Sequence, residues 1–170
     1  MDGGDAKRVL VIDDDAFVRK VVARALENAG CRVVGQAGDG SEGLRLYKDT
    51  TASAAPVGLF YKGVYHTLVL GPATSNTVAK CVYGISDTLA TNVYAQAGKC
   101  RVPTIVFACD NAPELDTEAP KGMVKVYPRR IDLDNTERLK SFEDTTVVES
   151  MAELEHAVEA RLKWLKSYSS

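Results

Sequence analysis

The sequence predicts a single α/β domain of three layers, in which a mostly parallel sheet has helices on both of its faces. Short apolar segments rich in Val and Ile alternate along the chain with segments whose apolar residues recur at helical spacing. That alternation is typical of parallel strands joined by helices. The chain has 170 residues, of which 45% are hydrophobic and 26% are charged, as expected of one compact domain.

Residues 1–50 predict the order strand, helix, strand, helix. Residues 7–12 form a β-branched run, and apolar residues recur at helical spacing over 17–26. Residues 31–34 are the next apolar run, and a Gly-rich turn then leads into a second helix over 41–49.

A break in this rhythm lies at 50–63. The segment holds small residues, a proline and two glycines, and it predicts a connection over the surface. A short strand at 67–70 follows, and the loop after it, at 72–76, leads into a helix that carries apolar residues from 78 to 83. A further helix is predicted over 88–97.

The last third of the chain completes the predicted sheet. Residues 102–108 are the most strand-like segment and predict a central, buried strand. Residues 110–122 hold two prolines and several acids and predict a long loop. Ser150 and Glu153 have the spacing of a capping box. The other predicted elements are a strand at 123–127, a helix at 132–142, a strand at 146–149 and a closing helix from 150.

Charge and cysteine usage exclude several kinds of partner. The formal net charge of −2 provides no attraction for nucleic acid or an anionic membrane. The first apolar run, at 9–12, is too short for a signal peptide or a membrane span, so we expect a cytoplasmic protein. No C-x-x-C pair suggests zinc or redox chemistry. The cysteines expected to be reduced and partly buried are Cys31, Cys81, Cys100 and Cys109.

Asp13, Asp14 and Asp15 form an acidic turn after the first predicted strand. Closely spaced carboxylates repel one another unless a hard cation such as Mg²⁺ binds between them. The segment VLVIDDDAFVRKVVARALENAGCRVVGQAGDGSEGL resembles the opening of a response-regulator receiver domain of the chemotaxis type. This resemblance implies a Mg²⁺ site at Asp13 and Asp14, beside an aspartate that accepts phosphate.

The other receiver residues are missing from their expected places. Gly71-Pro72 stands where the acceptor aspartate would follow the third strand, and Tyr127 replaces the receiver lysine. Ala108-Cys109 replaces the family's Ser or Thr. Because phosphotransfer needs the acceptor, we expect the acidic turn to be a solvated loop of the scaffold, with weak divalent metal binding as the alternative.

A second resemblance runs from about residue 55 to the C-terminus. The segment GPATSNTVAKCVYGISDTLATNVYAQAGK is similar to FMN-binding flavoproteins of the phosphopantothenoylcysteine decarboxylase superfamily, whose mark is a Pro-Ala-Ser/Thr-x-Asn-Thr-x-x-Lys loop. Through this segment and EAPKGMVKVYPRRIDLDNTERL, the chain most resembles archaeal flavoproteins of the dihydromethanopterin reductase type. The resemblance implies a flavodoxin-like or Rossmann-like fold and an FMN site.

The chemistry of this loop agrees with the resemblance. A helix N-terminus offers unpaired N–H groups that suit the acceptor atoms of a flavin ring or a phosphate. Pro72 and Ala73 allow a flat ring to approach closely. The alternative is that Ser75 or Asn76 only caps the helix. The predicted cofactor-binding residues are Pro72, Ala73, Thr74, Ser75, Asn76, Thr77, Lys80, Thr91 and Asn92.

The first loop departs from the flavoprotein pattern. That pattern has Gly and Ser near the FMN phosphate, whereas this chain has three aspartates, and phosphate and carboxylate repel each other. Two family patterns that meet at a Gly- and Ala-rich seam indicate an engineered or recombined chimera. Its parts within one domain, 1–170, are a receiver-like segment at 1–50, a seam at 51–64 and a flavoprotein-like segment at 65–170.

The leading functional hypothesis is an FMN-binding module for electron or hydride transfer, which is a flavin-dependent oxidoreductase if it is active. The alternative is a stable α/β scaffold without ligand or activity, and the third hypothesis is a receiver-type phosphorelay module. Relatives of the flavoprotein part form oligomers whose subunits share the flavin site, which implies a homo-oligomer. His66 and His156 are expected on the surface, so the sequence identifies no catalytic residue.

Overall fold

The computed structural model of the chain describes nearly all of the molecule from residue 55 onward and parts of the first third. The predicted acidic turn at 13–15, the predicted helix at 41–49 and Cys31 lie outside the described residues. The described residues are 8–12, 20, 23–24, 26–28, 32–37, 55–119 and 122–168.

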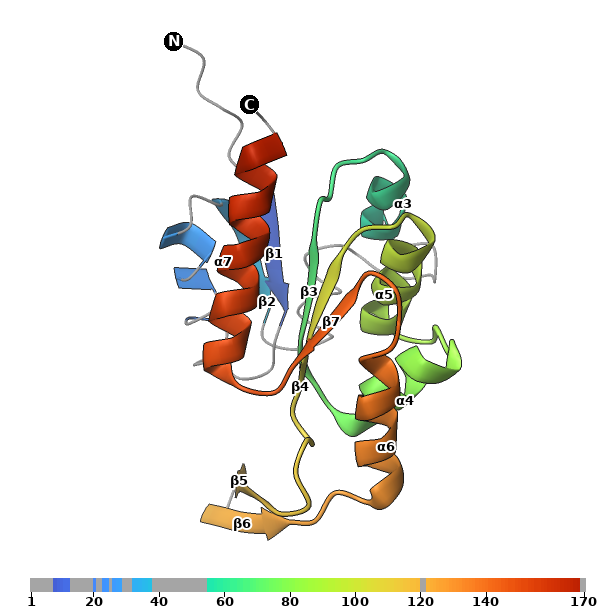
Figure 1. Ribbon diagram of the computed structural model, residues 1–170, viewed down its shortest axis with the longest axis vertical. Helices are drawn as coiled ribbons and strands as arrows, with labels where there is room; N and C mark the ends of the chain where they lie inside the picture. The colour runs from blue at the N-terminus through green and yellow to red at the C-terminus, as the bar shows by residue number, and fades with distance from the viewer. Residues whose placement is uncertain are drawn as a thin grey trace.

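Strands joined in parallel pairs form the middle layer of the molecule (Figure 1). β1 (Arg8–Ile12) pairs with β2 (Arg32–Ala37), and β4 (Thr104–Ala108) lies between β3 (Leu68–Ala73) and β7 (Thr145–Val148). β1 lies beside β3, so the spatial order is β2-β1-β3-β4-β7. This is a doubly wound order, in which the direction of winding reverses between β1 and β3.

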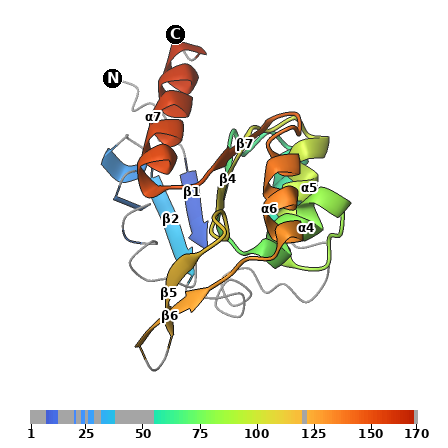
Figure 2. The same ribbon diagram turned by 60° about the horizontal axis from the view of Figure 1, so that its bottom comes forward.

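Helices cover both faces of this layer (Figure 1, Figure 2). On one face lie α3 (Ala55–Tyr61), α4 (Ser75–Tyr83), α5 (Leu89–Lys99) and α6 (Arg130–Leu139). α7 (Met151–Tyr168) lies on the other. The predicted three-layer α/β fold is therefore confirmed. Within the described ranges, no helix has the length and apolar character needed to cross a membrane.

β4 is the centre of the core because successive side chains are buried on opposite faces of the sheet. Ile105 packs in an apolar cluster with Leu154 and Val158 of α7 and with Leu26 of the partly described first helix. Val106 is fully buried in a second cluster, which includes residues of α4 and α6. A fully buried Val or Ile contributes about 2 kcal/mol. The prediction of a central, buried strand is confirmed.

The first turn of α7 has the predicted cap. Ser150 Oγ accepts a hydrogen bond from the N–H of Glu153 at 3.2 Å. The Glu153 carboxylate accepts one in turn from the N–H of Glu149 at 2.9 Å, one residue before the expected donor. Leu154 and Val158 begin the buried stripe that fixes the helix on the sheet.

α3 lies within the surface connection predicted at 50–63, so that prediction is wrong. Pro56 stands in the first turn of the helix, where its missing N–H removes no intrahelical bond. Phe60 is only 5% exposed and packs with Ala97 and Val102. One buried aromatic side chain therefore holds this helix in place, and the small residues around it do not predict a helix.

The prediction of a long loop at 110–122 is also wrong in part, because the segment contains a strand. β5 (Leu115–Ala119) pairs antiparallel with β6 (Gly122–Val126), which corresponds to the strand predicted at 123–127. The hairpin stands away from the three layers, at the foot of Figure 1. Because β6 is largely exposed, the hairpin lacks the apolar alternation that signals a buried strand.

β3 runs further than the predicted strand at 67–70, so Pro72 and Ala73 belong to the strand and not to the loop after it. At Gly71 the strand passes close to its neighbour: a Cβ added there would lie 2.7 Å from the Cβ of Phe107. Glycine is therefore required for the approach of β3 to β4.

Candidate functional site

The carboxyl ends of β3, β4 and β7 meet at one edge of the sheet, which we call the carboxyl edge. Ala73 is in register with Ala108, and Phe107 is in register with Val148. The N–H of Cys109 donates to the carbonyl of Ala73 at 3.1 Å and so joins the exits of β3 and β4. Ligands of doubly wound folds bind outside this edge, near the reversal of strand order. The residues that follow these strands therefore form the candidate site.

The first turn of α4 begins directly after β3 and lies at the carboxyl edge. Thr74 is its N-cap, with an extended backbone, and its Oγ1 accepts from the N–H of Thr77 at 3.4 Å. The carbonyl of Thr74 accepts from the N–H of Val78 at 2.9 Å. The alternative in which Ser75 or Asn76 caps the helix is wrong, because both residues are already helical.

One of the first three N–H groups of α4 stays available to a ligand. The N–H of Ser75 donates to Asp110 Oδ2 at 2.8 Å, and that of Thr77 donates to the Thr74 side chain. The N–H of Asn76 makes no hydrogen bond within the described part of the chain. The side chains of Thr74 and Asn76 are exposed. The turn thus presents one backbone donor and two polar side chains.

Asp110 and Asn111 follow β4 and complete the described part of the carboxyl edge. Asn111 Nδ2 donates to the carbonyl of Glu149 at 2.7 Å and to that of Ala108 at 3.3 Å, which joins the exits of β7 and β4. Asp110 orients the start of α4 through Ser75. Neither residue is among the predicted site residues, although a polar pair directly after the most strand-like segment is a signal for this edge.

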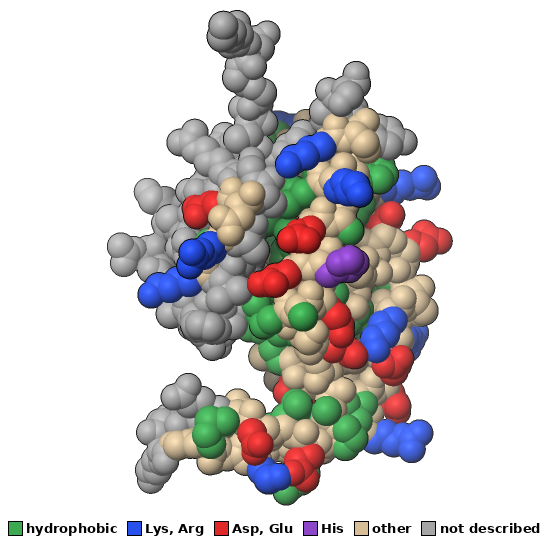
Figure 3. Space-filling model, turned by 60° about the vertical axis from the view of Figure 1, so that its left-hand side comes forward, with side chains coloured by type: hydrophobic (Ala, Val, Ile, Leu, Met, Phe, Trp, Pro, Cys, Tyr) green, Lys and Arg blue, Asp and Glu red, His purple; other side chains and the backbone are tan. Residues whose placement is uncertain are grey.

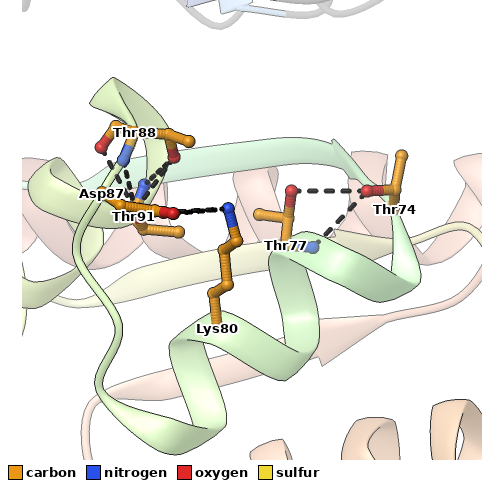
Figure 4. A network of polar contacts seen from close by, with 6 residues as sticks. All are labelled: Thr74, Thr77, Lys80, Asp87, Thr88 and Thr91. Atoms are coloured by element: carbon orange, nitrogen blue, oxygen red, sulfur yellow. Dashed lines mark hydrogen bonds and ion pairs between the residues drawn. The ribbon is translucent and has the colours of Figure 1, made fainter.

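The start of α5 is closed by its own residues (Figure 4). The N–H of Thr88 donates to Thr91 Oγ1 at 3.0 Å, and the N–H of Thr91 donates to Thr88 Oγ1 at 3.2 Å. Thr91 is only 1% exposed. Lys80 Nζ forms an ion pair with Asp87 at 2.9 Å, which ties α4 to the loop before α5. Lys80 and Thr91 therefore have partners within the chain, while Asn92 beside them is half-buried.

The described cysteines and both histidines lie as the sequence predicts. Cys81, Cys100 and Cys109 are reduced thiols that are buried or half-buried. Burial raises the pKa of the Cys81 thiol to about 12, so this thiol is protonated and poorly nucleophilic at neutral pH. His66 and His156 are exposed.

A metal site is predicted only at Asp13 and Asp14, and both lie outside the described residues. Across the part of the chain that is described, no group of three His, Cys, Asp or Glu side chains is arranged to hold a metal ion. The donors that the first turn of α4 presents are N–H, hydroxyl and amide groups, which suit the acceptor atoms of an organic ligand.

Sequence comparison relates the chain to known proteins. A model of the Flavoprotein family matches residues 10–163. An uncharacterised protein of Methanocaldococcus jannaschii is 38% identical over 104 residues, which are 60% of this chain and 56% of that protein. The dihydromethanopterin reductase (acceptor) of Methanosarcina mazei is 41% identical over 83 residues, which are 49% of this chain and 35% of that protein. The chain thus spans about half, or less, of the length of these relatives.

A solved structure resembles nearly the whole chain. DmrB of Burkholderia xenovorans in complex with FMN has 42% sequence identity and a TM-score of 0.75, and the match covers 96% of this chain and 99% of that one. That structure is described as a cubic protein cage for redox transfer. The expected flavoprotein fold is confirmed by this similarity.

The comparisons treat the two predicted parts of the chain as one. The Flavoprotein match begins at residue 10 and continues across the predicted seam at 51–64. It therefore includes most of the segment that resembles a receiver. Neither the family match nor these relatives support a receiver-like origin or a chimera.

Proposed function

The chain belongs to the Flavoprotein family, and from this premise we propose that it binds FMN at the carboxyl edge and takes part in redox transfer. The observation that carries the proposal is the 42% identity to the FMN complex of DmrB over 96% of the chain. The similarity to dihydromethanopterin reductases supports the same class of reaction. The alternative is a scaffold that binds no ligand, and titration with FMN distinguishes the two.

The residues at the start of α4 fit the ring of a flavin. A flavin ring carries carbonyl oxygens and ring nitrogens that accept hydrogen bonds, and the N–H of Asn76 is a donor without an acceptor in the described chain. The exposed side chains of Thr74 and Asn76 add further polar groups. Pro72 is half-buried at the end of β3 and can border a flat ring, whereas Ala73 is buried in the apolar cluster beneath it and supports the strand end from inside.

We assign the ring, and not the phosphate, to this turn because of Asp110. Its carboxylate accepts the N–H of Ser75 at 2.8 Å, so it occupies a donor that an anion would use. It also adds negative charge where the helix dipole would otherwise favour an anion. A neutral ring is compatible with that charge, whereas a phosphate would be repelled. The predicted repulsion of phosphate by the acidic turn at 13–15 stays a prediction.

FMN, when bound, supplies the hydride or electron transfer. The chain's own residues bind and orient it. Asn76 donates through its backbone N–H, Asp110 holds the first turn of α4 in place through Ser75, and Asn111 fixes the exits of β4 and β7. The site is therefore built on rigid strand and helix ends, which is the arrangement that holds a cofactor in one orientation.

The remaining predicted site residues take supporting roles in this proposal. Thr91 closes the first turn of α5, and Lys80 holds the loop before α5 through Asp87. Both act on the position of α5 and not directly on the cofactor. A contact of Asn92 with FMN stays a prediction.

The proposal extends to assembly. DmrB is described as a cage, and because nearly its whole chain matches this one, we expect a homo-oligomer. The cytoplasmic location stays a prediction.

Titration of the purified, flavin-free protein with FMN tests the proposal. We expect saturable quenching of flavin fluorescence and a shift of the flavin absorbance band. Asn76→Asp places a carboxylate beside the ring acceptors and weakens FMN binding by about tenfold or more. Ala90→Asp, at the equivalent second position of α5, is the matched control and leaves the affinity unchanged. A colourless wild-type protein that does not respond to FMN would contradict the proposal and favour the scaffold alternative.

A further inference from the structure

An arm projects from the body of the molecule (Figure 1, Figure 2). It consists of β5, β6 and Tyr127, which follows β6. β5 and β6 pair with each other and form a separate sheet among the described strands. The arm leaves the body after β4 and returns to it at α6. It therefore begins after one element of the body and ends before another, while its own strands pack little on the other described elements.

Large apolar side chains of the arm are exposed on both of its faces. Met123 is 66% exposed and Val124 is 42% exposed, and successive residues of a strand point to opposite faces. Tyr127, at the end of the arm, is 66% exposed. A two-stranded hairpin is only marginally stable in water unless it packs on another surface. Among the described strands the arm pairs with no other sheet, so a surface supplied by another molecule would stabilise it.

The arm also has open backbone edges. Its described sheet contains only β5 and β6, so each strand has one edge without a neighbouring strand. Such an edge presents N–H and C=O groups that can pair with another strand. An edge that pairs with the same edge of a second molecule about a two-fold axis forms a closed contact.

The charge of the arm favours a protein partner. Lys125 forms an ion pair with Glu114 and stands opposite Asp116 in the strand register. Hydrophobic, acidic and basic side chains lie side by side on the arm at the foot of Figure 3. A surface for a membrane or a nucleic acid would instead carry an excess of Lys and Arg. Because these charges are balanced within the arm, a second copy of the arm would not be repelled.

We infer that the arm is an interaction surface and that its occupant is a second copy of this chain. The inference rests on the homo-oligomer proposed above and names the surface that forms it. A stable interface uses about 20–30 residues on each side, more than the two five-residue strands provide. The arm therefore strengthens a contact to which the body also contributes.

Light scattering after size-exclusion chromatography, over a range of protein concentrations, tests the inference on the full chain. The double variant Met123→Glu with Tyr127→Ser should raise the concentration at which half of the protein is assembled by about tenfold or more. Tyr61→Ser is the matched control, because Tyr61 is 70% exposed on α3, and it should assemble as the wild type does. Arm variants that keep the wild-type mass, or a control that dissociates equally, would overturn the inference.

Hydrogen exchange of the wild-type protein provides a test without substitutions. The amides of 122–127 should exchange more slowly at concentrations where the protein is assembled than after dilution. An assembled protein whose arm exchanges at the same rate as the diluted one would overturn the inference. A monomeric wild type would also overturn it, and would leave the arm to a different protein. FMN titration of the same sample shows separately whether the proposed function still stands.

Discussion

The starts of α4 and α5 share a pattern, a threonine followed three residues later by another. They differ in whether the backbone N–H groups of the turn have partners. In α5, Thr88 and Thr91 bind each other reciprocally, and Thr91 is 1% exposed. In α4, Thr74 accepts from Thr77, and the N–H of Asn76 keeps no partner in the described chain. The same capping pattern therefore only stabilises the first turn of α5, whereas in α4 it leaves a donor for a ligand.

The position of each turn in the sheet explains the difference. α4 begins at the exit of β3, where Asp110 reaches it from the exit of β4 at 2.8 Å from the Ser75 nitrogen. α5 begins after a loop that Lys80 and Asp87 hold against α4. The first turn of α4 follows β3 directly and lies at the carboxyl edge, where doubly wound folds bind ligands. Location in the fold, and not the residue pattern alone, separates the two turns.

Thr91→Val should give the largest difference between the two turns. Because the side chain is buried, the variant leaves the N–H of Thr88 without its acceptor and lowers the free energy of unfolding by about 2 kcal/mol. Thr77→Val, at the same position of α4, changes a half-exposed turn and should cost less than about 0.5 kcal/mol. Urea denaturation measures both. An equal fall in the free energy of unfolding for both variants would mean that the threonine contacts stabilise the two turns equally.

The pH dependence of stability tests whether α4 is packed on the core through its buried residue Cys81. Burial raises the pKa of Cys81 to about 12 from 9.0, so the folded state resists loss of the proton. The resulting stability is fully present below pH 9 and is lost as the pH rises toward 12. Between pH 8 and pH 10 the loss is about 1.4 kcal/mol. Urea denaturation at both values should show a smaller loss for Cys81→Ala, and identical losses would contradict burial of this thiol.

Asp110→Ala tests the contact that sets the start of α4 apart. The variant removes the acceptor of the Ser75 N–H and should lower the free energy of unfolding by about 1 kcal/mol. Asp110→Asn keeps a side-chain oxygen and should recover most of that loss. Asp134→Ala, an exposed carboxylate on α6, is the control and should stay within about 0.5 kcal/mol of wild type. Thermal denaturation of the three variants measures the difference, and the contact has no role if Asp110→Ala matches the control.

Lys80→Met should have the smallest effect. The ion pair with Asp87 is partly exposed, with 32% and 54% of the two side chains accessible, so its loss should cost less than about 1 kcal/mol. FMN affinity should stay within about twofold of wild type, since the ammonium group serves the loop before α5 and not the cofactor. A large loss of FMN affinity at unchanged stability would instead place Lys80 at the cofactor.

Much of the fold can be predicted from the sequence because its signals are local. The apolar run at 102–108 is long and β-branched enough to indicate the central strand, and the stripe that begins at Leu154 indicates α7. α3 escapes prediction because a single anchor, Phe60, holds it in place. β5 escapes because it pairs with β6 on an exposed arm, where no burial pattern is imposed.

The candidate site is predicted less completely because several of its contacts join residues that are far apart in the sequence. The loop pattern locates Thr74 and Asn76, which act within one turn. The contacts made by Asp110 and Asn111 join residues 35 and 38 positions apart, and no local pattern reports them. Thr91 is a different case, since its spacing from Thr88 already fits a capping box and indicates a structural role.

Hydrogen–deuterium exchange of the wild-type protein with and without FMN tests the central claim, that FMN binds at the open turn of α4 and not at the closed turn of α5. The method also works for a large assembly. FMN should slow exchange in peptides covering 72–80 and leave peptides covering 86–94 unchanged, because Asn76 gains an acceptor while Thr91 already has its partners. FMN binding that protects 86–94 and leaves 72–80 unchanged would contradict the account.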